Sequence, residues 1–122
     1  MTARTPAQAR GRWAEDRALD YLQQRGLRLL ERNYRCRYGE IDLVMEEGSV
    51  LVFVEVRYRA SQRFGGALES VDRRKQSKLL VTAKCYLKER RADRPARFDV
   101  AALSRSPGGW SVDWVKDAFQ AE

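Results

Sequence analysis

The stretch from Gly39 to Arg59 constrains the fold more than any other part of the sequence. Two apolar runs are separated there by Glu47-Gly48-Ser49, where the glycine supplies the permissive backbone that a tight turn needs. We therefore expect a β-hairpin with strands at Gly39–Glu46 and Val50–Arg57. The second run is apolar on both faces up to Val54, which is typical of a central strand that is covered on both sides.

Each strand of this hairpin carries an acid, Asp42 in the first and Glu55 in the second. A carboxylate in a central strand is costly unless it is paired, hydrogen-bonded or bound to a metal ion. Two carboxylates that face one point can bind Mg²⁺ or Mn²⁺ through oxygen, and the metal can then activate water beside a phosphate. The spacing fits a structural role equally well, in which Glu55 pairs with a buried arginine and Asp42 caps a turn.

Polar side chains from other positions are candidates to join the two acids. Arg57 follows the second acid by two residues, so it lies on the same face of the strand, and it offers paired donors to a phosphate oxygen. Glu15 interrupts the apolar stripe of the first helix, either as a site residue or as a border residue that reaches solvent or an arginine. Lys75 and Gln76 lie where the apolar stripe of the second helix turns polar, which means that this end either projects past the core or faces a polar site.

Hydrophobic periodicity and turn residues predict the remaining elements. Asn33 is expected to break or bend the first strand, Ser70 to be the N-cap of the second helix, and Ile41, Leu43 and Met45 to point to one face. The fold class is therefore α/β, with a single mixed β-sheet flanked by helices in the order α-β-β-β-α-β-β. Besides the hairpin, we expect helices at Ala7–Arg25 and Val71–Arg91, strands at Leu27–Arg37, Ala96–Leu103 and Trp110–Val115, and a C-terminal segment Asp117–Glu122 in which Phe119 docks.

The composition limits the chemistry and the location of the protein. Its 122 residues suit one domain, with disordered tails expected at residues 1–5 and 120–122. The absence of histidine excludes Ser-His-Asp and Cys-His catalytic sites and histidine-ligated zinc. No run is apolar enough to span a membrane and the N-terminus lacks the apolar core of a signal peptide, so we expect a cytoplasmic protein. Cys36 and Cys85 match no metal-ligand spacing and are expected to be reduced, structural thiols.

The formal net charge of +7 favours a polyanionic partner, most often nucleic acid. Arginines and tyrosines alternate between Arg28 and Tyr38, a pattern that suits phosphate contact with stacking and suits an ordinary exposed strand equally well. A basic, glycine-containing loop is expected at Tyr58–Leu68. The oligomeric state stays open, with a homodimer as one option. The candidate nucleic-acid-binding residues are Arg35, Arg37, Arg59, Arg63, Arg74 and Gln76.

Several motifs accompany the two acids along nearly the whole chain. They are Gly39-Glu40-Ile41-Asp42-Leu43, Val52-Phe53-Val54-Glu55-Val56-Arg57-Tyr58-Arg59, Phe64-Gly65, Lys75-Gln76, Arg97-Phe98-Asp99-Val100 and Asp117-Ala118-Phe119. Together they resemble the YraN-like family of small bacterial proteins. That family is similar to the PD-(D/E)xK nuclease superfamily and, within it, to the archaeal Holliday-junction resolvases. The resemblance implies a restriction-endonuclease-like fold and a nuclease site.

The resemblance also implies roles for individual residues. Asp42 and Glu55 match the two metal-ligating acids of the superfamily, and the backbone carbonyl of Val56 matches an assisting ligand. Glu15 matches the acid that resolvase-like members supply from their first helix. The implied cofactor is Mg²⁺ or Mn²⁺.

Two departures from the superfamily pattern leave the activity open. Arg57 stands in the place of a lysine that orients or activates the attacking water, and arginine stabilises charge but stays protonated and is a poor base. Ile41 stands where the pattern has proline. Lys75 is the candidate to supply the missing lysine from the second helix.

The sequence therefore predicts a metal-dependent DNA endonuclease, with selectivity for DNA structure as a further option. One alternative is a nuclease-like fold that binds nucleic acid with weak or no catalysis. A second alternative is a non-catalytic adaptor or structural protein whose acids are only paired. Fold by itself does not decide between the three.

Overall fold

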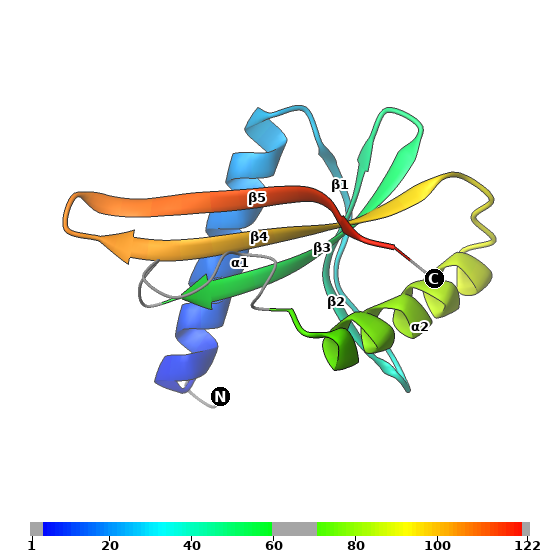
Figure 1. The fold of residues 1–122 in the computed structure, drawn as a ribbon, viewed down its shortest axis with the longest axis horizontal. Coiled ribbons are helices and arrows are strands. Elements are labelled where there is room, and N and C mark those ends of the chain that lie inside the picture. Colours follow the sequence, from blue (N-terminus) through cyan, green and yellow to red (C-terminus); the bar gives the residue numbers. More distant parts are fainter. Residues whose placement is uncertain (1–3, 60–70, 121–122) are drawn as a thin grey trace.

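Five strands form one mixed β-sheet in the spatial order β1-β2-β3-β4-β5, in a computed structural model that describes residues 4–59 and 71–120 (Figure 1). β3 and β4 run parallel, and the other neighbouring strands are antiparallel. A parallel pair needs a crossover connection, and this one contains α2. The α/β class and the order α-β-β-β-α-β-β are therefore confirmed. The elements are α1 (Pro6–Gln24), β1 (Arg28–Cys36), β2 (Gly39–Glu47), β3 (Val50–Arg59), α2 (Arg73–Glu89), β4 (Ala96–Ser106) and β5 (Gly109–Phe119).

Two hydrophobic cores lie on opposite faces of the sheet, one under each helix. Alternate residues of β3 separate them, because neighbouring side chains of a strand point to opposite faces. Val54 packs with Leu22 of α1, and Phe53 packs with Leu79 of α2. The α1-side core comprises Ala14, Ala18, Leu22, Leu27, Leu43, Met45, Val52, Val54, Ala101 and Leu103, and the α2-side core comprises Tyr34, Ile41, Val44, Leu51, Phe53, Val71, Leu79, Ala83, Tyr86, Val100 and Ala102.

The start of α2 differs from the sequence prediction. Asp72 is the N-cap, and its carboxylate accepts the N–H of Lys75 at 2.9 Å. An aspartate in this position satisfies one of the free N–H groups of the first helical turn. The prediction of Ser70 as the cap is therefore wrong, and Ser70 lies outside the described residues. The helix begins at Arg73, and Val71, which was predicted to be its first residue, lies before it in the α2-side core.

Parts of the predicted loop and tails, at residues 1–3, 60–70 and 121–122, lie outside the described residues. Thr5, at the end of the predicted N-terminal tail, caps α1 by accepting the N–H of Gln8 at 3.1 Å. β3 continues to Arg59, two residues beyond its predicted end. No helix within residues 4–59 and 71–120 is long and apolar enough to cross a membrane.

β1 and β2 change faces at Asn33 and Asp42, which lie opposite each other between paired residues. Asn33 has a φ of 52°, a left-handed conformation that asparagine tolerates better than most residues, so the predicted bend is confirmed. Ile41 consequently packs in the α2-side core, whereas Leu43 and Met45 pack in the α1-side core. The prediction that these three share a face is wrong, because alternation with a period of two assumes an uninterrupted strand.

β5 is longer than predicted because it contains a bulge near its end. Between the pairs Val100–Val115 and Phe98–Phe119, β4 advances two residues and β5 advances four. Asp117, inside the bulge, has a φ of 51°. The strand thus reaches Phe119, whose ring stacks on that of Phe98 at a centroid distance of 4.9 Å. The predicted docking of Phe119 is confirmed, although in a strand rather than in a tail.

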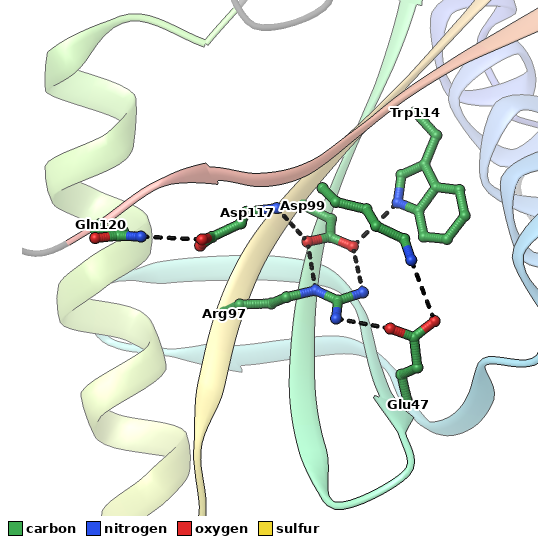
Figure 2. Close-up of polar contacts among 7 residues, drawn as sticks. Glu47, Arg97, Asp99, Trp114, Asp117 and Gln120 are labelled. Carbon is green, nitrogen blue, oxygen red and sulfur yellow. Dashed lines mark hydrogen bonds and ion pairs between the residues drawn. The ribbon is translucent and has the colours of Figure 1, made fainter.

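The bulge is held by the carboxylate of Asp99, which is fully buried (Figure 2). This carboxylate accepts hydrogen bonds from Arg97 at 3.0 and 3.2 Å and from the indole N–H of Trp114 at 3.0 Å. It also accepts the backbone N–H of Asp117 at 2.9 Å. Arg97 in turn donates to Glu47 at 2.8 Å. A buried charge is stable in this position because both its oxygens are hydrogen-bonded and a cation lies beside it.

We expect Asp99→Asn to lower the free energy of unfolding by about 2–4 kcal/mol, because it leaves Arg97 without its charged partner in a buried place. Urea denaturation followed by circular dichroism measures this loss. Asp20→Asn is the matched control, since the Asp20 side chain is 57% exposed on α1. The control should change the free energy of unfolding by less than about 0.5 kcal/mol. Equal losses in both variants would contradict the structural role of the Asp99 network.

Candidate functional site

Asp42 and Glu55 come together where β2 separates from β3. The paired residues of the two strands end at Leu43 and Val54. Just beyond that pair, Oδ2 of Asp42 accepts the N–H of Val56 at 2.8 Å, so that a side chain replaces the strand backbone as the partner of β3. The carboxyl group of Glu55 lies close enough for its charge to act on Asp42. The end of the hairpin pairing is thus where the two acids meet.

The surroundings of Asp42 favour its protonated form at neutral pH. Burial, and then the charge of Glu55, raise the pKa of Asp42 to about 8, against the opposing effect of the hydrogen bond from Val56. The charge of Glu15 adds to this increase in the pKa. Such a shift is typical of carboxylates that are forced together without a cation between them.

Glu55 is buried, with 7% of its surface exposed, and it reaches α2. Its Oε2 lies 3.6 Å from Nζ of Lys75 and has no hydrogen-bond partner among the described residues. The arginine partner that a structural role for Glu55 would have is replaced here by a lysine from the crossover helix. The structure therefore brings Asp42, Glu55 and Lys75 into one place.

Glu15 lies beside this place but is engaged by β1. Its carboxylate accepts hydrogen bonds from Arg32 at 3.3 Å and from the side-chain amide of Asn33 at 3.0 Å. The same amide donates to Glu40 at 3.1 Å. Within residues 4–59 and 71–120, no three His, Cys, Asp or Glu side chains are arranged to hold a metal ion together. Glu15 thus acts on the acid pair through its charge.

Arg57 and Val56 flank Glu55 on β3. Arg57 is half-buried, and its Nε has no hydrogen-bond partner in the part of the chain that the structure describes. The N–H of Val56 donates to Asp42 and so links β3 to β2. A guanidinium with a free donor, two residues after Glu55 on the same strand, can bind an anion that approaches it.

The other predicted basic residues do not converge on the acid pair. Arg35 pairs with Glu40 at 3.4 Å, and the guanidinium of Arg37 lies 4.9 Å from the ring centre of Tyr38. Arg59 pairs with Asp113 at 3.6 Å.

The candidates on α2 are the sequence neighbours of Lys75, which reaches Glu55. Arg74 is exposed in the first turn of the helix, directly before Lys75. Gln76 donates to the carbonyl of Val71 at 3.0 Å and lines a cavity of about 680 Å³ between α2 and the end of β5. Arg63 lies outside the described residues.

Asn33 and Arg32 are site neighbours that the sequence did not reveal. Asn33 bridges two acids, Glu15 and Glu40, from the point where β1 changes faces. The signal that could have found it is the asparagine itself, since a residue of this type inside a strand pattern indicates a special backbone conformation with a free side chain. Arg32 carried no such signal, because its contact with Glu15 depends on how α1 packs on β1.

Comparison with known proteins gives the family. The family model described as "Uncharacterised protein family UPF0102" matches residues 14–103. The chain belongs to this family. A UPF0102 protein of Methylococcus capsulatus is 54% identical, over 92% of this chain and 91% of its own length. UPF0102 proteins of Pseudomonas syringae pv. tomato and Janthinobacterium sp. are 49% and 48% identical over 99% of this chain, and over 100% and 95% of their own lengths. The resemblance to the YraN-like family is thereby confirmed.

Without a divalent metal ion, the acid pair makes stability depend on pH. Asp42 loses its proton near pH 3.8 in the unfolded chain but near pH 8 in the folded protein. Between these values the folded state binds more protons, so the free energy of unfolding contributed by Asp42 falls as the pH rises and then levels off. Asp42→Asn should remove this fall and be more stable than the unaltered protein near pH 8. Urea titrations across the interval, in buffer with a chelator, measure both slopes, and equal slopes would contradict the shift.

Proposed function

We propose that the chain is a metal-dependent endonuclease that hydrolyses phosphodiester bonds in nucleic acid, with DNA as the expected substrate. The observation that carries this proposal is the acid pair itself. Asp42 is half-buried beside the buried Glu55, its pKa is raised to about 8, and Oε2 of Glu55 has no hydrogen bond among the described residues. A protein retains such a costly pair where a cation or a reaction uses it.

The donor set fits a hard cation such as Mg²⁺ or Mn²⁺. Mg²⁺ is commonly held by one or two carboxylates, several water molecules and the phosphate of a substrate, rather than by a complete cage of side chains. Two acids therefore suffice, and the absence of a third converging acid within residues 4–59 and 71–120 is compatible with this mode. Asp42, Glu55 and the carbonyl of Val56 would hold the ion. When bound, such an ion neutralises phosphate charge and activates a water molecule.

The remaining residues of the site have roles that follow from their chemistry. Arg57 stays protonated, so it can bind a phosphate oxygen but cannot remove a proton from water. Nζ of Lys75, 3.6 Å from Glu55, carries three donors and can orient either a water molecule or a phosphate oxygen at the acid pair. Lys75 would therefore take over the role of the superfamily's lysine, whose position in this chain is occupied by Arg57.

The basic surface supports a polyanionic substrate. The chain has 24 Lys and Arg residues against 17 Asp and Glu residues. Arg74 stands exposed beside Lys75 in the first turn of α2, and Arg57 keeps a free donor within the described part of the chain. Basic residues around an acid pair attract a phosphate backbone that the acids alone would repel.

A nucleic-acid-binding protein without catalysis is the second candidate. The specific observation that favours it is Arg57, which cannot serve as a base. Such a protein would bind DNA with an affinity that falls steeply with salt, because each neutralised phosphate releases counterions. It would show no turnover with any divalent metal.

We expect Mn²⁺ to bind at the acid pair and to bind more tightly at pH 8 than at pH 6, because Asp42 must lose its proton first. Isothermal titration calorimetry measures this affinity. Asp42→Asn should weaken it by at least about tenfold, the loss typical even of residues that only support a metal ligand. Asp20→Asn, exposed on α1, should leave it unchanged. Unaltered Mn²⁺ binding by the Asp42→Asn protein would mean that the metal lies elsewhere.

We expect highly purified protein to cleave DNA with Mg²⁺ or Mn²⁺, and linear, flapped and four-way substrates to reveal any structural preference. Asp42→Asn and Glu55→Gln should abolish cleavage, since both remove a negative oxygen ligand. Lys75→Ala should reduce the rate about 10²-fold or more, the usual contribution of a group that assists proton transfer. Lys84→Ala removes the same charge from an exposed position of α2 and should retain the rate.

The pattern of outcomes separates the candidates. Salt-sensitive DNA binding without cleavage would support the second candidate and reject the first. Cleavage that survives in the Asp42→Asn protein would come from a contaminant or another site. If the protein binds neither Mn²⁺ nor DNA, the adaptor or structural role is the one that remains.

A further inference from the structure

Cys36 and Cys85 lie far apart in the sequence, but the fold brings both to the edge of the α2-side core, where each influences the pKa of the other. Cys36 is the last residue of β1, and Cys85 lies in the second half of α2. Both are free, half-buried thiols at the edge of the α2-side core, so they are neither sealed in the interior nor fully exposed. Two cysteines must lie next to each other in this way before a disulfide can form between them.

The Cys36 sulfur has several donors around it. The backbone N–H of Tyr38 donates to it at 3.4 Å, and the N–H of Gly39 also contributes a hydrogen bond. Burial alone would raise the pKa of Cys36, but the hydrogen bond from the Tyr38 N–H and the other polar groups around the sulfur outweigh burial and lower it. Thiols in such surroundings have more thiolate character, and the thiolate is the nucleophile.

Cys85 has the opposite character. The interaction with Cys36, followed by burial, raises the pKa of Cys85, whereas the pKa of Cys36 is lowered. A thiol with a lowered pKa next to a thiol with a raised pKa is the arrangement that redox-sensing cysteine pairs use.

The backbone holds the two thiols in place. Gly39, which follows Cys36 by three residues, lies so close to α2 that a Cβ atom there would come within 2.9 Å of Oγ1 of Thr82. Thr82 is itself buried one helical turn before Cys85, and its hydroxyl donates to the carbonyl of Lys78 at 2.8 Å. The end of β1 and the middle of α2 are thus pressed together at the position of the two thiols.

We propose that Cys36 and Cys85 form a reversible intramolecular disulfide when the protein meets a peroxide, with Cys36 reacting first and Cys85 second. The Cys36 thiolate attacks one oxygen of hydrogen peroxide, the O–O bond breaks, and hydroxide leaves and takes up a proton to become water. Cys36 is then a sulfenic acid. The sulfur of Cys85 attacks the sulfur of Cys36, the S–O bond breaks, and the hydroxyl leaves as water with the proton of Cys85. The two thiols lose two electrons in total, and the peroxide gains both.

The bond would tie α2 to the end of β1. The same helix carries Lys75 at its first turn, 3.6 Å from Glu55. A cross-link that closes the long loop between residues 36 and 85 restricts the unfolded chain, so the oxidised protein should unfold at a higher temperature than the reduced one.

The test uses the full-length, reduced protein and hydrogen peroxide. After treatment, both thiols should be protected from a maleimide reagent, and the intact mass should fall by two hydrogen atoms. Digestion should yield one linked pair of peptides containing Cys36 and Cys85. The product should remain monomeric on a non-reducing gel, melt at a higher temperature and recover both thiols after treatment with dithiothreitol.

Two variants assign the order of reaction. Cys85→Ser should leave Cys36 as a sulfenic acid that a dimedone probe captures. Cys36→Ser should leave Cys85 reactive toward maleimide at the same dose of peroxide. Thiols that stay free in the unaltered protein at a dose that oxidises glutathione would overturn the proposal, as would cross-links solely between chains. Capture of a Cys85 sulfenic acid in place of a Cys36 one would reverse the assigned order and overturn that part. Because the main readout uses the unaltered protein, a variant that fails to fold does not affect it.

Discussion

The hydrogen bond from the Val56 N–H to the Asp42 carboxylate is the interaction on which the rest of the site depends. Backbone pairing between β2 and β3 ends at Leu43–Val54, and this bond continues the connection through a side chain. Because the strands are released from each other there, β2 can change faces and send Ile41 into the α2-side core. The same release leaves room for two carboxyl groups. The separation of the strands and the acid pair are therefore one structural feature.

The chain treats its buried acids in two different ways. Asp99 is surrounded by Arg97, Trp114 and the backbone of Asp117. Its charge is therefore neutralised, and these hydrogen bonds come from residues of β4 and β5. At Asp42 the surroundings instead raise the pKa to about 8, and Nε of Arg57, two residues after Glu55, has no hydrogen-bond partner among the described residues. The chain contains many arginines, and one of them at this place would have neutralised Asp42 and Glu55 in the way that Arg97 neutralises Asp99. That it does not do so is the physical reason to regard the pair as functional and Asp99 as structural.

The elements that depend on local pattern could be predicted from the sequence. The hairpin, the element order and the meeting of α2 with β3 follow from strand periodicity, from the turn at Gly48 and from the polar end of the second helix. What could not be predicted depends on contacts between distant segments. The face change requires the left-handed backbone of Asn33, the length of β5 requires the buried partner Asp99, and the contact of Cys36 with Cys85 requires the docking of α2 on β1.

The position of α2 on the sheet determines both the contact of Lys75 with the acid pair and the contact of Cys85 with Cys36. Lys75 reaches the acid pair because Asp72 starts the helix directly before it and because Leu79 and Tyr86 fix the helix on the sheet. Farther along, Thr82 touches Gly39 at the start of β2, the strand that carries Asp42. A shift of α2 along its axis would therefore move Lys75 away from Glu55 and Cys85 away from Cys36 together. A cationic group supplied by a crossover helix, unlike one fixed on β3 as Arg57 is, makes the chemistry of the acid pair sensitive to how that helix is seated.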